Sequence, residues 1–231
     1  MKIHGIQKMT LLDFPGKVAC TVFLGGCDFR CPFCHNTELF DYEAKPVMSE
    51  EEFFAFLKKR KGLLDGVAIT GGEPMLRADL PEFMKKIKEL GYPVKCDTNG
   101  NHPEMLKKVV NEGLVDYIAM DIKNSPERYP ETAGLPAFAI AKVEESKNFL
   151  LEGHVDYEFR TTVVKQLHDR ESFEKIGEWI NGAERYFLQP FKDRDTVAFA
   201  GLSAPDDEEL KMFKNIVKPY VKSISVRGAE E

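Results

Sequence analysis

Three cysteines lie within eight residues of this 231-residue chain, in the segment CDFRCPFC. They are Cys27, Cys31 and Cys34, with the spacing C-x3-C-x2-C. Thiolates this close together can bind one metal centre if the loop folds around it. A four-iron cluster held by only three of them keeps one iron open to a ligand that is not protein, which suits catalysis. The same thiols could instead be buried packing groups, or three ligands of a zinc site completed by Cys96 or a distant histidine.

The composition excludes several other classes of protein. With 38 acidic and 32 basic residues, the net charge of −6 gives no general attraction to nucleic acid or anionic lipid. No apolar run approaches the roughly 20 residues of a membrane span, and the first residues have no signal-peptide core, so we expect a cytoplasmic protein. Cys20 and Cys96 fall inside apolar runs, and we expect them to pack as small hydrophobic residues.

Short apolar runs alternate with helical patterns along the chain and must position the cysteine loop. This alternation predicts a parallel α/β fold, either an open doubly wound sheet or a full or partial barrel, and periodicity does not decide between them. No linker marks a boundary, so we expect a single domain over residues 1–231. The expected strands cover residues 18–24, 67–70, 94–98, 115–122, 157–164, 185–188 and 223–226. The expected helices start at the Ser49 capping box and at Asp79, and cover 103–111, 138–151, 172–180 and 206–217.

The cysteine loop after the first of these strands, followed by the segment GGEP after the second, resembles the radical S-adenosylmethionine (SAM) superfamily. The resemblance implies that the three cysteines hold a [4Fe–4S] cluster and that SAM chelates the fourth iron. The reduced cluster of such enzymes cleaves the cofactor to methionine and a 5′-deoxyadenosyl radical. By the same resemblance, Phe33 lies near the adenine, while Gly71, Gly72 and Glu73 receive the cofactor's amino group.

A closer resemblance starts at residues 6–17, IQKMTLLDFPGK, which run into GGCDFRCPFCHN. Together they resemble the activating proteins of anaerobic ribonucleoside-triphosphate reductase, short relatives of the pyruvate formate-lyase activating enzyme, over essentially the whole chain. This implies a partial (β/α)6 barrel and an enzyme that abstracts hydrogen from one glycine of a partner protein. It also places Asp13 and Phe14 at the partner surface. Because the chain has no second cysteine cluster, we expect electrons from a donor of the flavodoxin or ferredoxin type.

Two further segments, CDTNG at 96–100 and AMDIK at 119–123, resemble segments of the same family. In the formate-lyase activator the corresponding groups bind a monovalent cation beside the cofactor carboxylate. Carried over, the ligands of a potassium or sodium ion are Asp97, Thr98, the Ala119 carbonyl and Asp121. Hard oxygen ligands suit such an ion. The alternative is that Asp97 and Asp121 are helix caps or exposed strand-end acids.

Other polar residues fall at the carboxyl ends of expected strands, where barrel enzymes concentrate their chemistry. The resemblance assigns Asn99, Lys123, Arg160 and Gln189 to cofactor binding. Lys123 and Arg160 could hold the cofactor carboxylate or ribose, or be ordinary surface cations, and the formate-lyase relative has a histidine where Gln189 stands. The four histidines in polar segments are expected to be exposed to solvent: His4, His102, His154 and His168.

Three functions compete at this point. The first is an activase that generates a glycyl radical, with anaerobic ribonucleotide reductase as the expected partner. The second is a radical enzyme acting on a small molecule, for which the 7-carboxy-7-deazaguanine synthases are a similar short-barrel example. The third is a non-catalytic module whose cysteines bind zinc.

Overall fold

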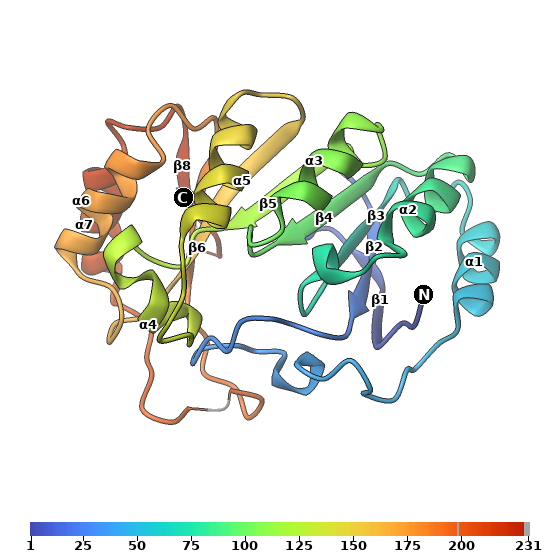
Figure 1. The fold of residues 1–231 in the computed structure, drawn as a ribbon, viewed down its shortest axis with the longest axis horizontal. Helices are drawn as coiled ribbons and strands as arrows, with labels where there is room; N and C mark the ends of the chain where they lie inside the picture. Colours follow the sequence, from blue (N-terminus) through green and yellow to red (C-terminus); the bar gives the residue numbers. More distant parts are fainter. Residues whose placement is uncertain (198, 229–231) are drawn as a thin grey trace. The chain divides into compact units, whose positions relative to one another are not determined.

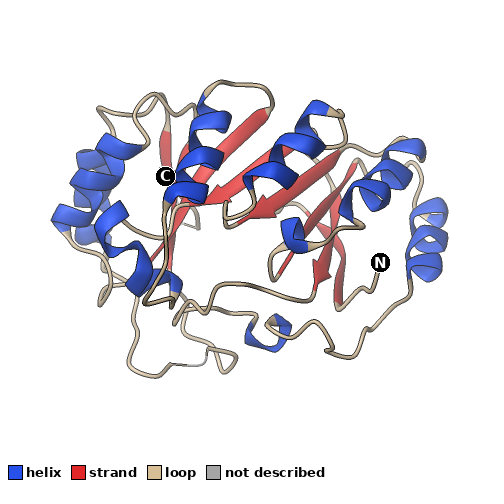
Figure 2. Ribbon diagram, in the orientation of Figure 1, coloured by secondary structure: helices blue, strands red, loops and turns tan. Residues whose placement is uncertain are grey.

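The computed structural model describes residues 1–197 and 199–228, which divide into two compact units. The N-terminal unit contains residues 1–28, 38–119 and 154–156, and the C-terminal unit contains 29–37, 120–153 and the chain from 157 onward. In both units helices follow strands along the chain (Figure 2). The alternation confirms the predicted α/β class, and the prediction that residues 1–231 form one domain stays a prediction.

The N-terminal unit is built on four strands that are neighbours in chain order (Figure 1). The last three are parallel, as expected, with Cys20 opposite Val67 and Ile69 opposite Cys96. The first strand is antiparallel and was not predicted, because most of its side chains are exposed or half-buried and it has no apolar run. The strands are β1 (Gly5–Thr10), β2 (Ala19–Leu24), β3 (Gly66–Gly71) and β4 (Val94–Thr98). The helices are α1 (Glu50–Lys59), α2 (Leu80–Glu89) and α3 (Pro103–Asn111).

Local signals fix where these helices begin. The Ser49 hydroxyl accepts a hydrogen bond from the backbone N–H of Glu52 at 3.2 Å, and the Glu52 carboxylate accepts the Ser49 N–H at 2.8 Å. This is the predicted capping box of α1. Asp79 precedes α2 as expected, but its side chain makes no capping bond and instead lies 3.6 Å from the N-terminal amine.

Strand β5 (Tyr117–Asp121) crosses the boundary between the units, with Met120 and Asp121 on the C-terminal side. The C-terminal unit then continues with parallel strands and with helices, of which α4 was not predicted because it has only five residues. The strands are β6 (Asp156–Val163), β7 (Tyr186–Pro190) and β8 (Ile224–Val226). The helices are α4 (Tyr129–Ala133), α5 (Ala141–Leu151), α6 (Arg170–Trp179) and α7 (Asp207–Val217). Short 3-10 turns occupy η1 (Thr37–Leu39), η2 (Pro74–Leu76) and η3 (Pro126–Arg128).

Each unit has its own apolar core. In the N-terminal unit, Val22, Leu24 and Ile69 are fully buried, as expected for strands covered on both faces. In the C-terminal unit, helices α6 and α7 lie side by side, and the rings of Phe173 and Phe213 stack with centroids 4.3 Å apart (Figure 1). Among the described residues, no helix is long and apolar enough to cross a membrane.

The turn that contains Asp13 and Phe14 lies at the amino-terminal ends of β2 and β3. Asp65, directly before β3, donates its N–H to the Val18 carbonyl at 2.6 Å and accepts the Val18 N–H at 3.1 Å. Phe14 is only 3% exposed and packs against the Tyr117 ring, with centroids 6.2 Å apart. The structure therefore places the Phe14 ring in the core, and a contact of this residue with a partner stays a prediction.

Asp13 does not point freely into solvent either. It is half-buried, and its carboxylate accepts a hydrogen bond from the Thr21 hydroxyl at 2.5 Å. The side chains directly before Asp13 are the exposed ones, with Leu11 70% and Leu12 84% exposed. The Asp13–Thr21 hydrogen bond therefore holds the turn between β1 and β2 against β2.

Candidate functional site

The cysteine loop folds into a tight turn at its second and third cysteines. The Cys34 N–H donates to the Cys31 carbonyl at 3.1 Å, and the Cys34 sulfur accepts the Asn36 N–H at 3.4 Å. The Cys31 side chain is buried, whereas Cys27 and Cys34 are half-buried. The turn is anchored by Arg30, whose N–H donates to the Ala133 carbonyl at the end of α4 at 2.9 Å. The other two cysteines are fully buried in β2 and β4, as expected.

The charge around Cys31 comes from a lysine of the same unit. Burial raises the pKa of the Cys31 thiol to about 11, and the Lys123 ammonium acts in the opposite direction. The Lys123 ammonium also lies 5.8 Å from the centre of the Phe33 ring, which is 4% exposed. Phe33, which lies on the cysteine loop and was assigned to the adenine, is therefore close to the Lys123 ammonium.

The glycines of the GGE segment are required by close backbone packing in the N-terminal unit. The Glu73 N–H donates to the Gly26 carbonyl at 2.7 Å, and the Gly26 N–H donates to the Leu39 carbonyl at 2.8 Å. A Cβ atom at Gly72 would come within 2.1 Å of the Gly26 carbonyl oxygen. Gly71 has a φ of +122°, a conformation that only glycine adopts readily. These contacts bring the end of β3 against the glycine turn that precedes Cys27.

Glu73 links the carboxyl ends of β3 and β4 through hydrogen bonds. Its carboxyl group is 1% exposed and accepts hydrogen bonds from the Met75 N–H at 2.9 Å, the Thr98 hydroxyl at 2.9 Å and the Asn99 N–H at 2.6 Å. These bonds use three of its roughly four acceptor positions. Burial, together with repulsion from Asp28, raises the pKa of Glu73 to about 7. The predicted contact to the cofactor's amino group would have to use the position that is left.

Asp28, directly after Cys27, accepts three side-chain hydrogen bonds from the segment after β4. The donors are the Asn99 amide at 2.8 Å, the Asn101 amide at 2.7 Å and the His102 ring at 2.9 Å. Burial alone would raise the pKa of Asp28, but these hydrogen bonds outweigh it and lower the pKa to about 2. Asp28 thus ties the first cysteine of the loop to the end of β4.

We call this cluster the amide network, and sequence reasoning missed half of it. His102 was expected to be exposed, and that expectation is wrong because its ring contacts Asp28 and is 22% exposed. Asn101 was not considered. The signal that could have identified them is an acid inside the cysteine loop together with three side chains able to donate hydrogen bonds within the four residues that follow a strand. The members of the amide network are Asp28, Glu73, Thr98, Asn99, Asn101 and His102.

A second cluster of charged groups follows β5 in the C-terminal unit. The Asp121 carboxylate accepts hydrogen bonds from the Arg160 guanidinium at 2.5 Å and from the Lys123 ammonium at 2.8 Å. Its backbone carbonyl accepts the Tyr129 hydroxyl at 3.2 Å. We call Asp121, Lys123 and Arg160 the cation network. It contains three of the residues that the sequence assigned to the site, and none of them is an exposed surface charge.

The pKa values of Asp121 and Lys123 both shift toward the charged forms. Burial would raise the pKa of Asp121, but Arg160 and Lys123 outweigh burial and lower it. Burial would likewise lower the pKa of Lys123, but Asp121 and Cys31 outweigh it and raise the pKa above its usual range. The network therefore keeps two cations beside one carboxylate.

The other predicted ligands of a monovalent cation lie in the N-terminal unit. The Asp97 carboxylate contacts the Lys95 ammonium, and the Thr98 hydroxyl donates to Glu73. Ala119 is fully buried in β5. Gln189 is half-buried in β7, opposite Thr162. The structure therefore places Asp97 in an ion pair inside the protein, whereas the contacts proposed for Gln189 stay predictions.

Two more histidines are structural groups rather than exposed side chains. His4 is 8% exposed, and its Nδ1 accepts the Gly25 N–H at 2.8 Å. His168 is 4% exposed; its Nδ1 accepts the Val164 N–H at 3.1 Å, so its Nε2 carries the proton and donates to the Lys123 carbonyl at 2.9 Å. Burial lowers the pKa of His168, which keeps it neutral in this role. Of the four histidines expected to be exposed, only His154 is.

His35, next to Cys34, was not assigned a role beyond being too close to that cysteine to share its ion. Its ring stacks on Phe191 with centroids 5.5 Å apart, and its Nε2 lies 2.6 Å from the Lys192 carbonyl. These contacts attach the end of the cysteine loop to the segment after β7.

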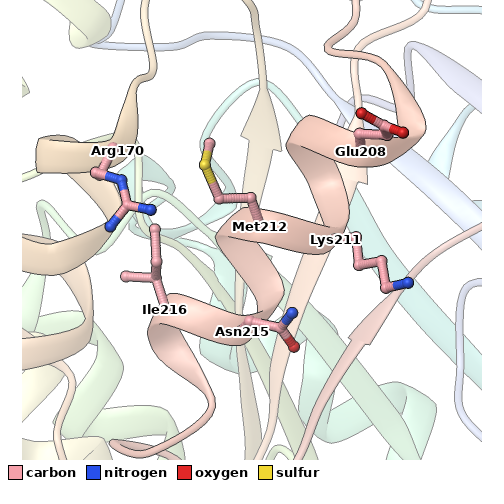
Figure 3. A pocket seen from close by; sticks show the side chains of 6 residues that line it. All are labelled: Arg170, Glu208, Lys211, Met212, Asn215 and Ile216. Carbon is pink, nitrogen blue, oxygen red and sulfur yellow. The ribbon is translucent and has the colours of Figure 1, made fainter.

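A groove between helices α6 and α7 is separate from all of these clusters. Figure 3 shows Arg170 reaching toward Met212 and Ile216, while Lys211 and Glu208 extend from the other side of α7. None of the predicted site residues lines the groove, and it contains no thiol. The chemistry suggested by the sequence therefore lies elsewhere. The lining residues are Arg170, Glu208, Lys211, Met212, Asn215 and Ile216.

The three thiols of the cysteine loop are ligands of the type that an iron–sulfur cluster requires. Three thiols lie within one short loop, and the Lys123 ammonium beside Cys31 partly offsets the effect of burial, which by itself disfavours the thiolate form that iron requires. Across residues 1–197 and 199–228, no group of three or more His, Cys, Asp or Glu side chains is already drawn together as a metal cage. The assignment of Cys27, Cys31 and Cys34 as the cluster ligands therefore rests on their spacing and on the family comparison.

The radical SAM superfamily model matches residues 21–174, which include the cysteine loop and strands β3, β4 and β5. The chain therefore belongs to the radical SAM superfamily. Membership implies a [4Fe–4S] cluster and SAM as cofactors. It identifies the chain as an enzyme and overturns the alternative of a non-catalytic zinc-binding module.

Individual proteins agree with this assignment. A protein of Methanocaldococcus jannaschii, provisionally named a glycyl-radical enzyme activating enzyme, is 34% identical over 97% of this chain and 95% of its own length. The pyruvate formate-lyase-activating enzyme of Clostridium pasteurianum is 33% identical over 53% of this chain and 52% of its own. The crystal structure of a radical SAM methyltransferase from Sphaerobacter thermophilus matches 95% of this chain and 68% of that protein, with a TM-score of 0.74 at 15% identity. The fold is thus the partial barrel of this superfamily, as expected.

Proposed function

We propose that this radical SAM enzyme is an activase that abstracts a hydrogen atom from a glycine of a partner protein, and that the partner is an anaerobic ribonucleoside-triphosphate reductase. The observation that supports activation most strongly is the similarity to the M. jannaschii activating enzyme, which extends over nearly the full length of both chains. The choice of the reductase rests on the N-terminal segment IQKMTLLDFPGK and its resemblance to the reductase activators.

The cluster and SAM, when bound, supply the radical that takes the hydrogen atom. The chain's own residues position these groups. Cys27, Cys31 and Cys34 would hold the cluster, and Lys123 places a positive charge beside Cys31. Asp28 fixes the loop to the end of β4, and the cation network presents Arg160 and Lys123 as donors for an anionic group such as a carboxylate.

Electrons for the cluster must come from another protein, and we assign this role to a flavodoxin or a ferredoxin. Of the five cysteines in the chain, three lie on the predicted ligand loop and the other two are buried within β2 and β4. The chain therefore has no thiols left to bind a second cluster that could relay electrons.

The test mixes the reduced, cluster-loaded enzyme with SAM and an anaerobic ribonucleotide reductase. We expect a glycine-centred doublet in the electron paramagnetic resonance spectrum of the reductase, with about one 5′-deoxyadenosine formed per radical. Changing Cys27, Cys31 or Cys34 to alanine should abolish both signals. Cys20→Ala and Cys96→Ala are the matched controls and should retain the cluster.

Two outcomes would contradict the proposal in different ways. If the enzyme cleaves SAM slowly on its own but the reductase never acquires a radical, this partner is wrong, and a small-molecule substrate becomes the better candidate if other glycyl-radical enzymes also fail. If Cys96→Ala loses its cluster, the ligand set itself is wrong.

A further inference from the structure

A lysine lies buried in the middle of strand β4. Lys95 is 2% exposed and stands opposite Ala68 of β3 in the parallel ladder. Lysine is almost never this deeply buried unless a counter-charge is present. The counter-charge is Asp97, whose carboxylate contacts the Lys95 ammonium. Because side chains two residues apart project from the same face of a strand, the ammonium points along β4 toward its carboxyl end.

Asp97 is also the first ligand in the monovalent-cation site that the family resemblance implies. Its carboxylate oxygen is already bound to a protein cation. The next expected ligand, the Thr98 hydroxyl, donates its proton to Glu73 at 2.9 Å and accepts the Gly100 N–H at 3.1 Å. A hydroxyl has one donor and two acceptor positions, so only one acceptor remains for a metal ion.

The remaining acid of that site is neutralised in the same way within the C-terminal unit. Asp121 accepts hydrogen bonds from Arg160 and Lys123. Each of the two acids is thus neutralised within its own unit, Asp97 by Lys95 and Asp121 by Lys123 and Arg160. A monovalent metal ion would have to compete with the Lys95 ammonium for the Asp97 carboxylate. The donors of the N-terminal unit therefore do not fit such an ion.

We propose that the Lys95 ammonium is a built-in substitute for the monovalent cation, so that this enzyme binds SAM without potassium or sodium. A lysine ammonium is a compact, singly charged group with three donors, and it can satisfy a carboxylate as an alkali ion would. Being tethered, it neutralises Asp97 at any salt composition, and it keeps this carboxylate from repelling an anionic group bound nearby. The proposal rests on cofactor binding by the radical SAM superfamily and is independent of which partner is activated.

The test measures the dissociation constant of SAM for the reduced, cluster-loaded enzyme, from the change in its electron paramagnetic resonance spectrum. The titration is done at one ionic strength in potassium chloride, sodium chloride or N-methyl-D-glucamine chloride. For the wild-type enzyme the three values should agree within about twofold, since screening is equal in the three salts. A loss of affinity of about fivefold or more in the bulky organic cation would overturn the proposal.

In the Lys95→Met variant, the affinity for SAM should depend on which cation the salt contains, a dependence that the wild-type enzyme should lack. In N-methyl-D-glucamine, SAM should bind about tenfold more weakly, because Asp97 has lost its counter-charge. Potassium or ammonium ions should recover most of this loss. The double variant Lys95→Met/Asp97→Asn, which has neither charge, should show no difference between the salts. Equal sensitivity of the single and the double variant to potassium would contradict a role for the Lys95–Asp97 pair.

Thermal unfolding without SAM gives a readout that does not depend on the cofactor. The midpoint for Lys95→Met should rise in potassium chloride relative to N-methyl-D-glucamine chloride, whereas the wild-type midpoint should be equal in both. If Lys95→Met does not fold in either salt, Lys95→Arg retains the charge and should behave as wild type in both measurements. A potassium-dependent midpoint for wild type or Lys95→Arg would overturn the proposal.

Discussion

The amide network of the N-terminal unit and the cation network of the C-terminal unit hold buried carboxyl groups in opposite ways. In the amide network, Asp28 and Glu73 are held by neutral amides, a hydroxyl, backbone N–H groups and one histidine. In the cation network, Asp121 is held by a lysine and an arginine. Asn99 directly follows β4 and Asp121 ends β5, so both networks include a strand end, where the sequence predicted chemistry, whereas Arg160 lies within β6.

The difference shows that burial alone does not set the state of a carboxyl group. Within one network, the pKa of Asp28 falls to about 2 while that of Glu73 rises to about 7. Asp28 takes three side-chain donors, whereas Glu73 is more deeply buried and is repelled by Asp28. In the cation network the shifts of Asp121 and Lys123 both favour the charged form. The amide network can therefore respond to pH near neutrality, and the cation network keeps its charges.

The largest effect should follow from removing the one acid of the cation network. Asp121→Asn leaves Lys123 and Arg160, with side chains 13% and 12% exposed, without their counter-charge. Breaking a buried ion pair from one side costs about 3–5 kcal/mol of unfolding free energy. Urea unfolding under anaerobic conditions measures this.

The matched control is Glu178→Gln, which removes an acid from the exposed pair with Lys175. Exposed pairs of this kind contribute little, and no measurable change is expected. If Asp121→Asn behaves like this control, the cation network is not a buried charge cluster and the contrast with the amide network disappears.

A smaller effect should follow from Asp28→Asn in the amide network. The substitution keeps the shape but replaces one acceptor oxygen by an NH2 group that faces other donors. Because hydrogen bonds to a charged group contribute about 1.5–3 kcal/mol and these three share one carboxylate, we expect a loss of about 2 kcal/mol in unfolding free energy. The iron content after reconstitution and desalting should fall as well, because Asp28 follows Cys27 directly.

Asp41→Asn is the control for this variant. The Asp41 carboxylate is exposed and accepts only a local hydrogen bond, from the Glu43 N–H at 2.9 Å. It should retain full iron content. A loss for Asp28→Asn as large as for Asp121→Asn would show that neutral donors and cations stabilise these acids equally.

The smallest effect is on the pH dependence of the unfolding free energy, to which Glu73 and His168 contribute with opposite signs. The pKa of His168 is lowered from 6.5 in the folded protein, so its contribution is complete above pH 6.5 and is lost as the pH falls below it. The pKa of Glu73 is raised from 4.5 to about 7, so its contribution is complete below pH 4.5 and is lost as the pH rises toward 7. Just below pH 6.5 the two effects should oppose one another, because stability rises with pH through His168 and falls with pH through Glu73.

Glu73→Gln removes the decrease in stability that Glu73 causes as the pH rises. The unfolding free energy of this variant should then rise with pH between pH 5 and 6.5 more steeply than that of the wild-type protein, by up to about 1.4 kcal/mol per pH unit, because the opposing contribution of Glu73 is lost. His168→Gln should show the reverse tendency, with stability falling as the pH rises through the same range. Urea midpoints measured at several pH values check both, and identical slopes for wild type and Glu73→Gln would show that Glu73 is ionised throughout.

The sequence predicted the elements well where the local signals were strong. The β-branched runs at 94–98 and 67–70 became β4 and β3, and the capping box at Ser49 begins α1. β1 was missed because an edge strand with exposed side chains has no apolar run. The turn before β2 was assigned to a partner surface, although Phe14 is in the core, because a short motif does not show which way an aromatic ring points.

The sequence by itself determined the class of chemistry, because the spacing of Cys27, Cys31 and Cys34 is a local property of one loop. It also placed Asp121 and Lys123 at the end of a strand, because strand ends can be read from the pattern, whereas Arg160, which was assigned to a strand end as well, lies within β6. The tertiary structure alone decided which of these groups neutralise one another. Asp28 meets His102 across 74 positions, and Arg160 meets Asp121 across 39. A hydrogen bond depends on distance in space, and distances between remote parts of a chain are set only when the strands pair and pack.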